Sequence, residues 1–203
     1  MNLRALASHT VDLELLPESP VVLDVGCRGF DFSHEVLELR PQARVIALDP
    51  APDIVSFSRY VEFWRAALVG TGSASQSFAH FSTGEGDFIS ERRHMPGWDK
   101  QPEWSNVDCY TIGELMLAED VKHFDLVKLD CEGSEFAILE NWPGPIATQI
   151  SVEFHDWDKP RYRAEGYYEA LWKMLPSYRV VQHELSKQGE GVGHWDSLLV
   201  LAK

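Results

Sequence analysis

The chain has 203 residues, of which 44% are hydrophobic and 25% are charged, a balance typical of one folded domain and not of a disordered chain. Its 32 acidic and 18 basic residues give a formal net charge of −14, which argues against a protein that binds nucleic-acid phosphates. The sequence has no apolar run near the ~18–20 residues that span a bilayer, no secretory signal, and only three cysteines. We therefore expect one cytoplasmic domain over residues 1–203 that acts on a small molecule and binds neither nucleic acid nor membrane.

Strand and helix periodicities alternate along most of the chain. In chain order we predict a strand at 21–25, a helix at 32–39, a strand at 44–49, a helix at 53–60, and strands at 63–69, 77–81 and 107–111. A helix at 112–119, a strand at 125–130, a helix at 132–140, a strand at 150–155, a helix at 164–175 and a strand pair at 178–184 and 197–202 follow. This order predicts an α/β fold with a doubly wound, mostly parallel sheet and an antiparallel C-terminal strand.

Two stretches, 83–106 and 185–196, interrupt this pattern and are rich in glycine and polar or charged residues. Long loops on compact domains are often functional, so we predict that both are active-site loops. The basic run Glu91–His94 lies near Trp98 and Trp104, which predicts contact with an anionic or sugar-like acceptor. A solvated charge cluster is the simpler alternative.

A glycine turn follows the first predicted strand. Gly26 and Gly29 lie between that strand and a helix, where glycine lets the backbone pass close to a ligand and the helix offers free N–H groups. Asp49 ends the next strand, twenty residues after Gly29, where an acid can accept hydrogen bonds from both hydroxyls of an adenosine ribose. We expect Gly26→Val to exclude the cofactor while leaving the sheet folded.

Two classes of cofactor compete for this turn. The pyrophosphate of NAD needs G-x-G-x-x-G, whereas only two glycines are present, and the carboxylate of Asp24 would repel it. Asp24 would suit the ammonium group of S-adenosylmethionine (SAM). Alternatively, Gly26 and Gly29 only allow tight packing of the strand and the helix, with Asp24 capping the helix.

Residues 125–136 read Asp-Leu-Val-Lys-Leu-Asp-Cys-Glu-Gly-Ser-Glu-Phe. This run resembles the K-x-D-x-E-G-x-E signature of the FkbM family of SAM-dependent methyltransferases. The glycine turn is similar to the family's D-V-G-A-N-x-G, with Cys27 and Arg28 in the Ala and Asn places. Glu153 before Phe154 is similar to the family's strand that ends in glutamate before an aromatic residue.

Weaker similarities and two departures accompany this signature. Residues 66–70 resemble the family's A-L-G element, and a faint match lies near the C-terminus. Gly113 stands where the family's T-L-D segment has its acid. Arg28 replaces a small amide, and we expect it to point outward or to pair with Asp24 or Asp130.

The resemblance implies a seven-stranded class I methyltransferase sheet in the order 3-2-1-4-5-7-6, with SAM across the carboxyl ends of the first two strands. It also implies methyl transfer, which we expect to reach a hydroxyl oxygen of a small molecule or glycan. A SAM-binding accessory or regulatory protein without transfer activity is the alternative. The expected cofactor-binding residues are Asp24, Gly26, Cys27, Arg28, Gly29, Asp49, Pro50 and Asp130.

Methyl transfer to oxygen needs an aligned acceptor and a group that takes its proton. Asp130 ends the fourth strand and is the leading candidate for the base or for a polar contact to SAM or acceptor. Glu132 is expected to share a helix face with Glu135, and Glu153 to share a strand face with His155. Favourable charge at a helix N-terminus explains the first pair equally well, and His155 has a structural alternative. The expected catalytic residues are Asp130, Glu132, Glu153 and His155.

The same acids, His155 and Asp156 offer ligands for a hard divalent ion, but their spacing fits no metal motif. We therefore predict no metal site. Cys27 and Cys131 follow neighbouring strands and are expected to be buried free thiols.

Overall fold

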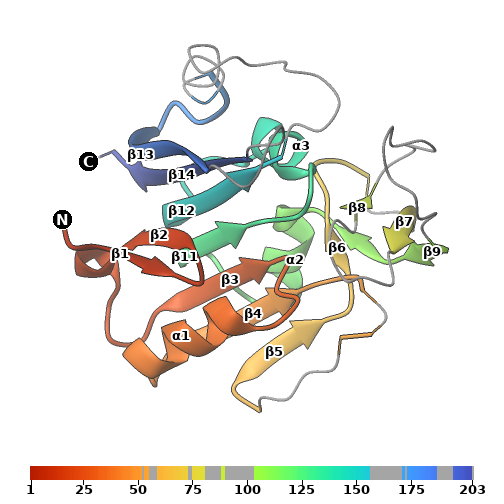
Figure 1. Ribbon diagram of the computed structural model, residues 1–203, viewed down its shortest axis with the longest axis horizontal. Coiled ribbons are helices and arrows are strands. Elements are labelled where there is room, and N and C mark those ends of the chain that lie inside the picture. Colours follow the sequence, from red (N-terminus) through yellow and green to blue (C-terminus); the bar gives the residue numbers. More distant parts are fainter. Residues whose placement is uncertain are drawn as a thin grey trace.

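The structure is a computed structural model that describes residues 1–51, 53–54, 59–72, 75–80, 88–89, 103–155, 171, 173–186 and 194–202. Figure 1 shows how the helices and strands are arranged. The strands are β1 (Leu3–Leu6), β2 (His9–Asp12), β3 (Val21–Val25), β4 (Arg44–Leu48), β5 (Val61–Trp64), β6 (Ala67–Leu68), β7 (Gln76–His80), β8 (Phe88–Ile89), β9 (Glu103–Val107), β10 (Cys109–Tyr110), β11 (Phe124–Leu129), β12 (Ala147–Phe154), β13 (Tyr178–Ser186) and β14 (His194–Leu201). The helices are the 3-10 turn η1 (Leu13–Leu15), α1 (Asp31–Leu39), α2 (Ile112–Ala118) and α3 (Glu135–Glu140).

Seven strands form the main sheet in the order β13-β14-β12-β11-β3-β4-β5. The five strands from β12 to β5 are parallel, and β14 is antiparallel to both of its neighbours. Numbered in chain order, this is the expected arrangement 3-2-1-4-5-7-6. Because the parallel strands end at one edge, the segments that follow β3, β4, β11 and β12 meet there (Figure 1).

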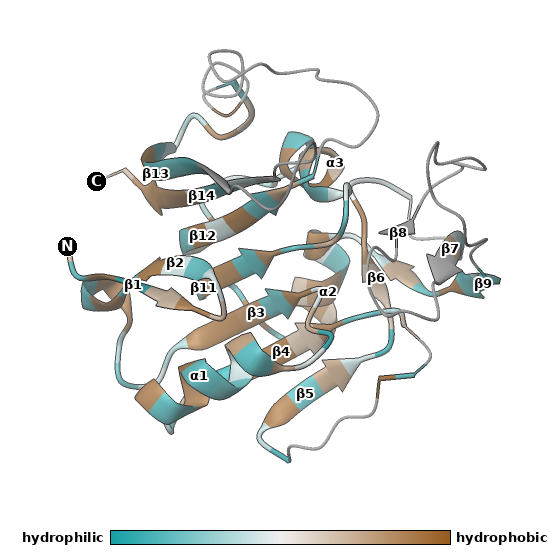
Figure 2. Cartoon of the chain, viewed as in Figure 1, coloured by the Kyte–Doolittle hydropathy of each residue, from teal (hydrophilic) through white to brown (hydrophobic). Residues whose placement is uncertain are grey.

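The central strands are buried on both faces. Val22 belongs to a hydrophobic cluster with Phe32 and Val36 of α1, whereas the next residue, Leu23, packs in a second cluster with Leu115 of α2. This alternation is the period of two expected for a strand between two packed layers. Figure 2 shows the polar and apolar faces of α1, which borders one of these layers.

A hairpin of β1 and β2 precedes the main sheet and was not predicted. Its strands pair from Leu3 with Asp12 to Leu6 with His9. Three of the four residues of β1 are exposed, so this strand has no alternation of buried and exposed positions that a sequence pattern would reveal.

The segment between β5 and α2 differs from the prediction. The strand predicted at 63–69 bends after Trp64, where the N–H of Ala66 donates to the Trp64 carbonyl at 2.9 Å. As a result, β6 leaves the main sheet and pairs with β10, which takes up part of the strand predicted at 107–111. The loop predicted at 83–106 contains β8 and most of β9, both of which pair with β7.

The helix predicted at 132–140 begins three residues late, at Glu135. Glu132 and Gly133 have φ of +52° and +105°, left-handed values that a right-handed helix excludes. Glu132 therefore lies in a turn and does not share a helix face with Glu135.

Two predicted helices are only partly described. Residues 55–58 of the helix predicted at 53–60 lie outside the described residues, as do 164–170 and 172 of the helix predicted at 164–175. Leu171 and Lys173–Met174 are helical. Within the described part of the chain, no helix has the length and apolar character needed to cross a membrane.

Candidate active site

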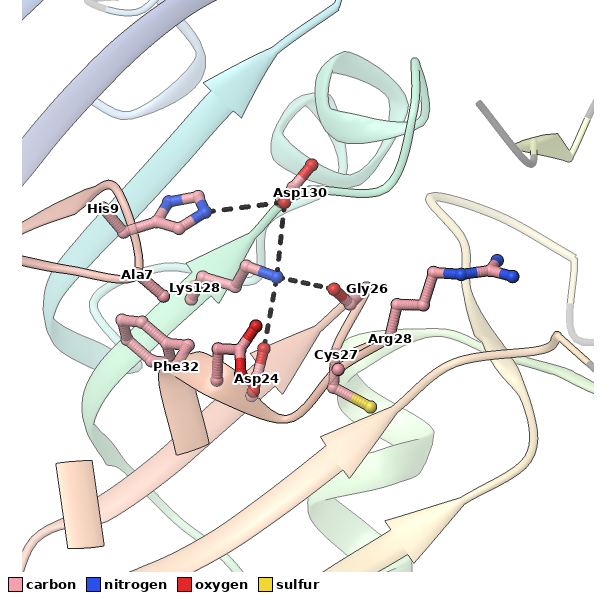
Figure 3. A pocket seen from close by; sticks show the side chains of 11 residues that line it. Ala7, His9, Asp24, Gly26, Cys27, Arg28, Phe32, Lys128 and Asp130 are labelled. Atoms are coloured by element: carbon pink, nitrogen blue, oxygen red, sulfur yellow. Dashed lines mark hydrogen bonds and ion pairs between the residues drawn. The ribbon is translucent and has the colours of Figure 1, made fainter. Parts of the chain in front are cut away.

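A pocket of about 180 Å³ lies at the carboxyl edge of the sheet (Figure 3). Its lining includes His9 of the hairpin, Asp24 of β3, the turn 26–29, Lys128 of β11 and Asp130 just beyond it. This volume is below the ~300–1,000 Å³ of a typical ligand site.

Lys128 is the buried cation at the centre of this pocket. Its ammonium group donates to the Gly26 carbonyl at 2.6 Å and lies 3.3 Å from Asp24 Oδ1 and 3.4 Å from Asp130 Oδ2 (Figure 3). Burial opposes its charge, but the carboxylates of Asp24 and Asp130 outweigh burial and raise the pKa of Lys128. Lys128 therefore stays charged and neutralises two acids that the sequence assigned to the cofactor.

Asp24 is fully buried beside this lysine. The hydroxyl of Ser33 donates to its Oδ2 at 2.6 Å, which ties β3 to α1. The cation beside Asp24 is thus the chain's own Lys128, where the sequence suggested the ammonium group of SAM. The sequence indicated a role for Lys128 only through its place in the family signature.

Gly26 is required by packing within the chain. It has φ of +75°, and a Cβ at this position would lie 1.7 Å from the carbonyl oxygen of Asp130. Its N–H donates to the Leu48 carbonyl at 2.9 Å, so the turn is held between β4 and the end of β11. Any side chain here displaces this contact, which argues against the expectation that Gly26→Val leaves the sheet intact.

The other residues of the turn lie around the pocket mouth. Arg28 pairs with Asp53 at 3.0 Å and not with Asp24 or Asp130, and its guanidinium group points away from Lys128 (Figure 3). Cys27 is buried, and burial raises the pKa of its thiol. Gly29 lines the pocket beside Asp31.

Asp49 and Pro50 follow β4 at the same edge but do not line the described pocket. Asp49 is buried, and its Oδ1 accepts a hydrogen bond from the N–H of Ala51 at 2.9 Å. It therefore shapes the turn after β4, at the place where a ribose contact was predicted.

Asp130 lies at the junction of three cationic or hydrogen-bonding side chains and is 28% exposed. Burial would raise the pKa of Asp130, but Lys128, His9 and His155 outweigh burial and lower it well below its usual range. A carboxylate with such a low pKa is a weak base. The charges around Asp130 thus disfavour it as the proton acceptor that the sequence predicted.

Glu132 has the opposite environment. Burial, together with the charge of Asp130, raises its pKa to about 7, although His155 opposes the shift. Its Oε2 lies 3.7 Å from His155 Nε2 and is buried with no hydrogen-bond partner among the described residues. The backbone of Glu132 is left-handed, which is uncommon for residues other than glycine. Where such residues occur, they are often at functional sites.

His155 is enclosed by acids. Its Nδ1 lies 3.1 Å from Glu135 Oε1, and its Nε2 lies 3.1 Å from Glu153 Oε1. Burial disfavours the imidazolium, but the hydrogen bonds to Glu135 and Glu153 prevail and raise the pKa of His155 to about 11. This pKa favours a protonated imidazole that pairs with the carboxylates around it, and it disfavours His155 as a base.

Glu135, which the sequence grouped with Glu132, is wholly buried and organises the turn before α3. Its carboxylate accepts from the N–H of Cys131 at 2.9 Å and from the N–H of Gly133 at 3.1 Å. It therefore anchors the loop between β11 and α3, which carries the family signature and is called the signature loop below.

His9 is the site residue that the sequence did not reveal. It is 3% exposed, and its Nε2 lies 3.5 Å from Asp130 Oδ2. Among the described residues, His9, Asp130 and Glu153 each bring one possible metal-ligand atom within 4.8 Å of the others. No motif surrounds His9, and only the hairpin brings it here.

Residues 90–102, 156–170 and 187–193, which include Asp156 and most of the predicted loops, lie outside the described residues.

The described sheet and the placement of this pocket define the class of protein. The fold is similar to an FkbM methyltransferase from Methylobacillus flagellatus KT, with a TM-score of 0.51, 10% identity, and coverage of 96% of this chain and 48% of that one. It is also similar to magnesium protoporphyrin IX methyltransferase from Synechocystis PCC 6803 with bound SAH, with a TM-score of 0.50, 10% identity, and coverage of 93% of this chain and 75% of that one. The chain therefore shares the fold of these two solved methyltransferases.

Sequence comparison places the chain more narrowly. The model of the methyltransferase FkbM domain matches residues 25–185, so the chain belongs to the FkbM family of SAM-dependent methyltransferases. A curated relative, 2-O-methyltransferase NoeI of Sinorhizobium fredii, is 22% identical over 196 residues, which cover 87% of this chain and 80% of the relative. The predicted family and the predicted cofactor, SAM, are confirmed.

Proposed function

We propose that the protein transfers the methyl group of SAM to a hydroxyl oxygen of a small molecule or glycan. The observation that carries this proposal is the pair of carboxyl groups after β11: Asp130 lines the pocket, and Glu132, two residues further on, has a pKa raised to about 7. Such a group accepts a proton at neutral pH, and an acceptor hydroxyl must lose one as its oxygen is methylated. The name of the relative NoeI, a 2-O-methyltransferase, supports oxygen as the acceptor atom.

The charges around the pocket suit a cationic cofactor. In the cluster that extends from the pocket through Asp130 to His155, carboxyl groups outnumber cationic side chains, since Lys128 contacts two acids and His155 contacts four. The buried Oε2 of Glu132 accepts no hydrogen bond among the described residues, although it lies 3.7 Å from His155 Nε2. The positive charge of SAM would compensate for this excess of acid.

The residues of the chain have separate roles in this proposal. SAM, when bound, supplies a methyl group activated by its sulfonium. The turn 26–29 and Asp49 hold the cofactor along the ends of β3 and β4. Asp130 orients the acceptor hydroxyl, and Glu132 takes the hydroxyl proton as the oxygen forms its bond to the methyl carbon.

Transfer from SAM with a deuterated methyl group tests this proposal. The protein is incubated with free sugars, glycosides, and aliphatic and phenolic alcohols, and mass spectrometry locates the label. We expect label on an oxygen atom and about 10²-fold less of it with Glu132→Gln, which keeps the shape of the side chain. Label on nitrogen or carbon contradicts the proposal. Binding of SAM with no labelled acceptor would favour an accessory protein without transfer activity.

A further inference from the structure

The N-terminal hairpin lies outside the part of the chain that the family model matches, which begins at residue 25. It is nevertheless fixed to the main sheet. The N–H of Asp12 donates to Gln149 Oε1 at 2.9 Å, and Gln149 Nε2 donates back to the Asp12 carbonyl at 3.2 Å. Leu6 and Val11 are fully buried in the cluster that also contains residues of α1. These contacts set the position of the hairpin relative to β12 and α1.

The turn of this hairpin overhangs the pocket. Ala7 and Ser8 both have positive φ, of 43° and 73°, and the tight turn they form directs the start of β2 inward. Ala7 and His9 both line the pocket (Figure 3). The ring of His9 packs edge-on against Phe32, with centroids 5.8 Å apart and planes at 82°, which holds the imidazole in place.

His9 and Lys128 share one oxygen of Asp130. The Nε2 of His9 lies 3.5 Å from Oδ2, and the ammonium group of Lys128 lies 3.4 Å from the same atom. The other oxygen, Oδ1, lies 4.0 Å from His155 Nε2, beyond hydrogen-bond distance. These two partners reach one oxygen from β2 and β11 and hold that side of the carboxylate, while Oδ1 faces His155.

We infer that His9 is a positioning residue of the methyl-transfer site: it and Lys128 hold the carboxylate of Asp130, which lines the pocket, in the orientation that meets the acceptor hydroxyl. This inference rests on the proposed function. It gives the hairpin a part in catalysis, because a carboxylate that rotates out of line loses the alignment that accelerates transfer.

The test compares His9→Leu and His9→Gln with Thr10→Ala. Thr10 is the next residue on β2, so its side chain points to the other face of the hairpin. At saturating SAM we expect His9→Leu to lower the transfer rate about 10-fold. His9→Gln, which keeps an N–H donor, should restore most of the rate, and Thr10→Ala should match wild type. The affinity for SAM, measured by calorimetry, should change less than about 3-fold in all three.

A double-mutant cycle shows whether His9 acts through Asp130. If it does, adding His9→Leu to Asp130→Asn lowers the rate little further, because the group that His9 positions is already absent. The inference is overturned if the fold losses of rate of the two single variants multiply in the double variant. It is also overturned if His9→Leu has the wild-type rate. A chelator that inactivates wild type but has no effect on His9→Leu also overturns it, because His9, Asp130 and Glu153 would then hold a divalent ion.

The four proteins of this cycle, which are wild type, His9→Leu, Asp130→Asn and the double variant, also separate failure of this inference from failure of the proposed function. If wild type transfers no methyl group, the proposed function fails, and the cycle is read from unfolding in denaturant. Non-additive changes in the midpoint then support the His9–Asp130 contact on which the inference depends, whereas strictly additive changes overturn it.

Discussion

At the scale of single residues, the site separates two carboxyl groups that are two positions apart in the sequence. Asp130 is surrounded by Lys128, His9 and His155, which stabilise its charge. Glu132 is buried beside other acids, which destabilises its charge and raises its pKa to about 7. Groups whose environments push their pKa values apart commonly divide the acid–base work of an active site. In the proposed function, Asp130 therefore orients the acceptor and Glu132 takes the proton.

Asp130→Asn should lower turnover more than cofactor affinity. Asparagine keeps the reach of aspartate but loses the charge that pairs with Lys128 and attracts a hydroxyl proton. We expect transfer at saturating SAM to fall by about 10-fold or more, with a change of less than about 3-fold in SAM affinity. The control is Asp125→Asn, at the far end of β11, where the side chain accepts a hydrogen bond from the N–H of Val21 at 2.8 Å. A large loss of affinity with unchanged turnover would assign Asp130 to cofactor binding.

Asp49→Ala should weaken binding of SAM and S-adenosylhomocysteine. Loss of hydrogen bonds from a charged group to the ribose is worth about 1.5–3 kcal/mol. Asp49→Asn can still accept from the N–H of Ala51, so it separates the ribose contact from the turn that Asp49 shapes. Asp53→Ala, which removes the exposed partner of Arg28, serves as a control. Calorimetry that finds wild-type affinity in Asp49→Ala would remove the ribose assignment.

At the scale of elements, the junctions between strands and loops decide where these residues lie. The turn after β3 packs directly on the end of β11 at Gly26, and the signature loop before α3 is held by Glu135. These junctions carry the polar groups to one edge of the sheet. They also explain why the helix predicted from residue 132 begins later, since a left-handed turn precedes it.

Gly26→Ala should lower both stability and cofactor binding. Its Cβ would lie 1.7 Å from the Asp130 carbonyl oxygen and would sit on a backbone of positive φ, so both segments must shift. We expect a loss of stability of at least about 1 kcal/mol, measured by denaturant unfolding. Gly113→Ala is the matched control, because nothing lies within 4 Å of its Cβ and it is helical. That change should stabilise α2 by about 0.5–1 kcal/mol. Equal stability of Gly26→Ala and wild type would show that the turn tolerates a side chain.

At the scale of the whole molecule, apolar periodicity was enough to predict the sheet, because buried strands and their helices repeat a pattern set by packing. The strand order followed from the family signature. His9 and the hairpin could not be predicted, since β1 is largely exposed and no local motif marks a histidine that reaches the site through tertiary contacts. The pairing of Asp24 with Lys128 was missed for the same reason, since two residues 104 positions apart meet only when β3 and β11 lie side by side.

The buried imidazolium makes the stability of the molecule depend on pH. His155 has a pKa of about 11 in the folded protein against 6.5 ordinarily, so its stabilising effect is complete below about pH 6.5 and is lost as pH rises towards 11. We expect the thermal midpoint to fall from pH 7 to pH 10. His155→Gln should lower the midpoint at pH 7 and flatten this decline, whereas His123→Gln, at an exposed position, should not. Parallel curves for wild type and His155→Gln would contradict the assigned pKa.

The pH dependence of methyl transfer tests the central claim most directly. If Glu132 takes the acceptor's proton, it must be deprotonated to act, so the wild-type rate at saturating SAM should rise with pH and level off above about 7. Glu132→Gln should lack this rise and transfer about 10²–10⁴-fold more slowly at the plateau. A Glu132→Gln protein with the wild-type rate and the same rise would show that another group takes the proton.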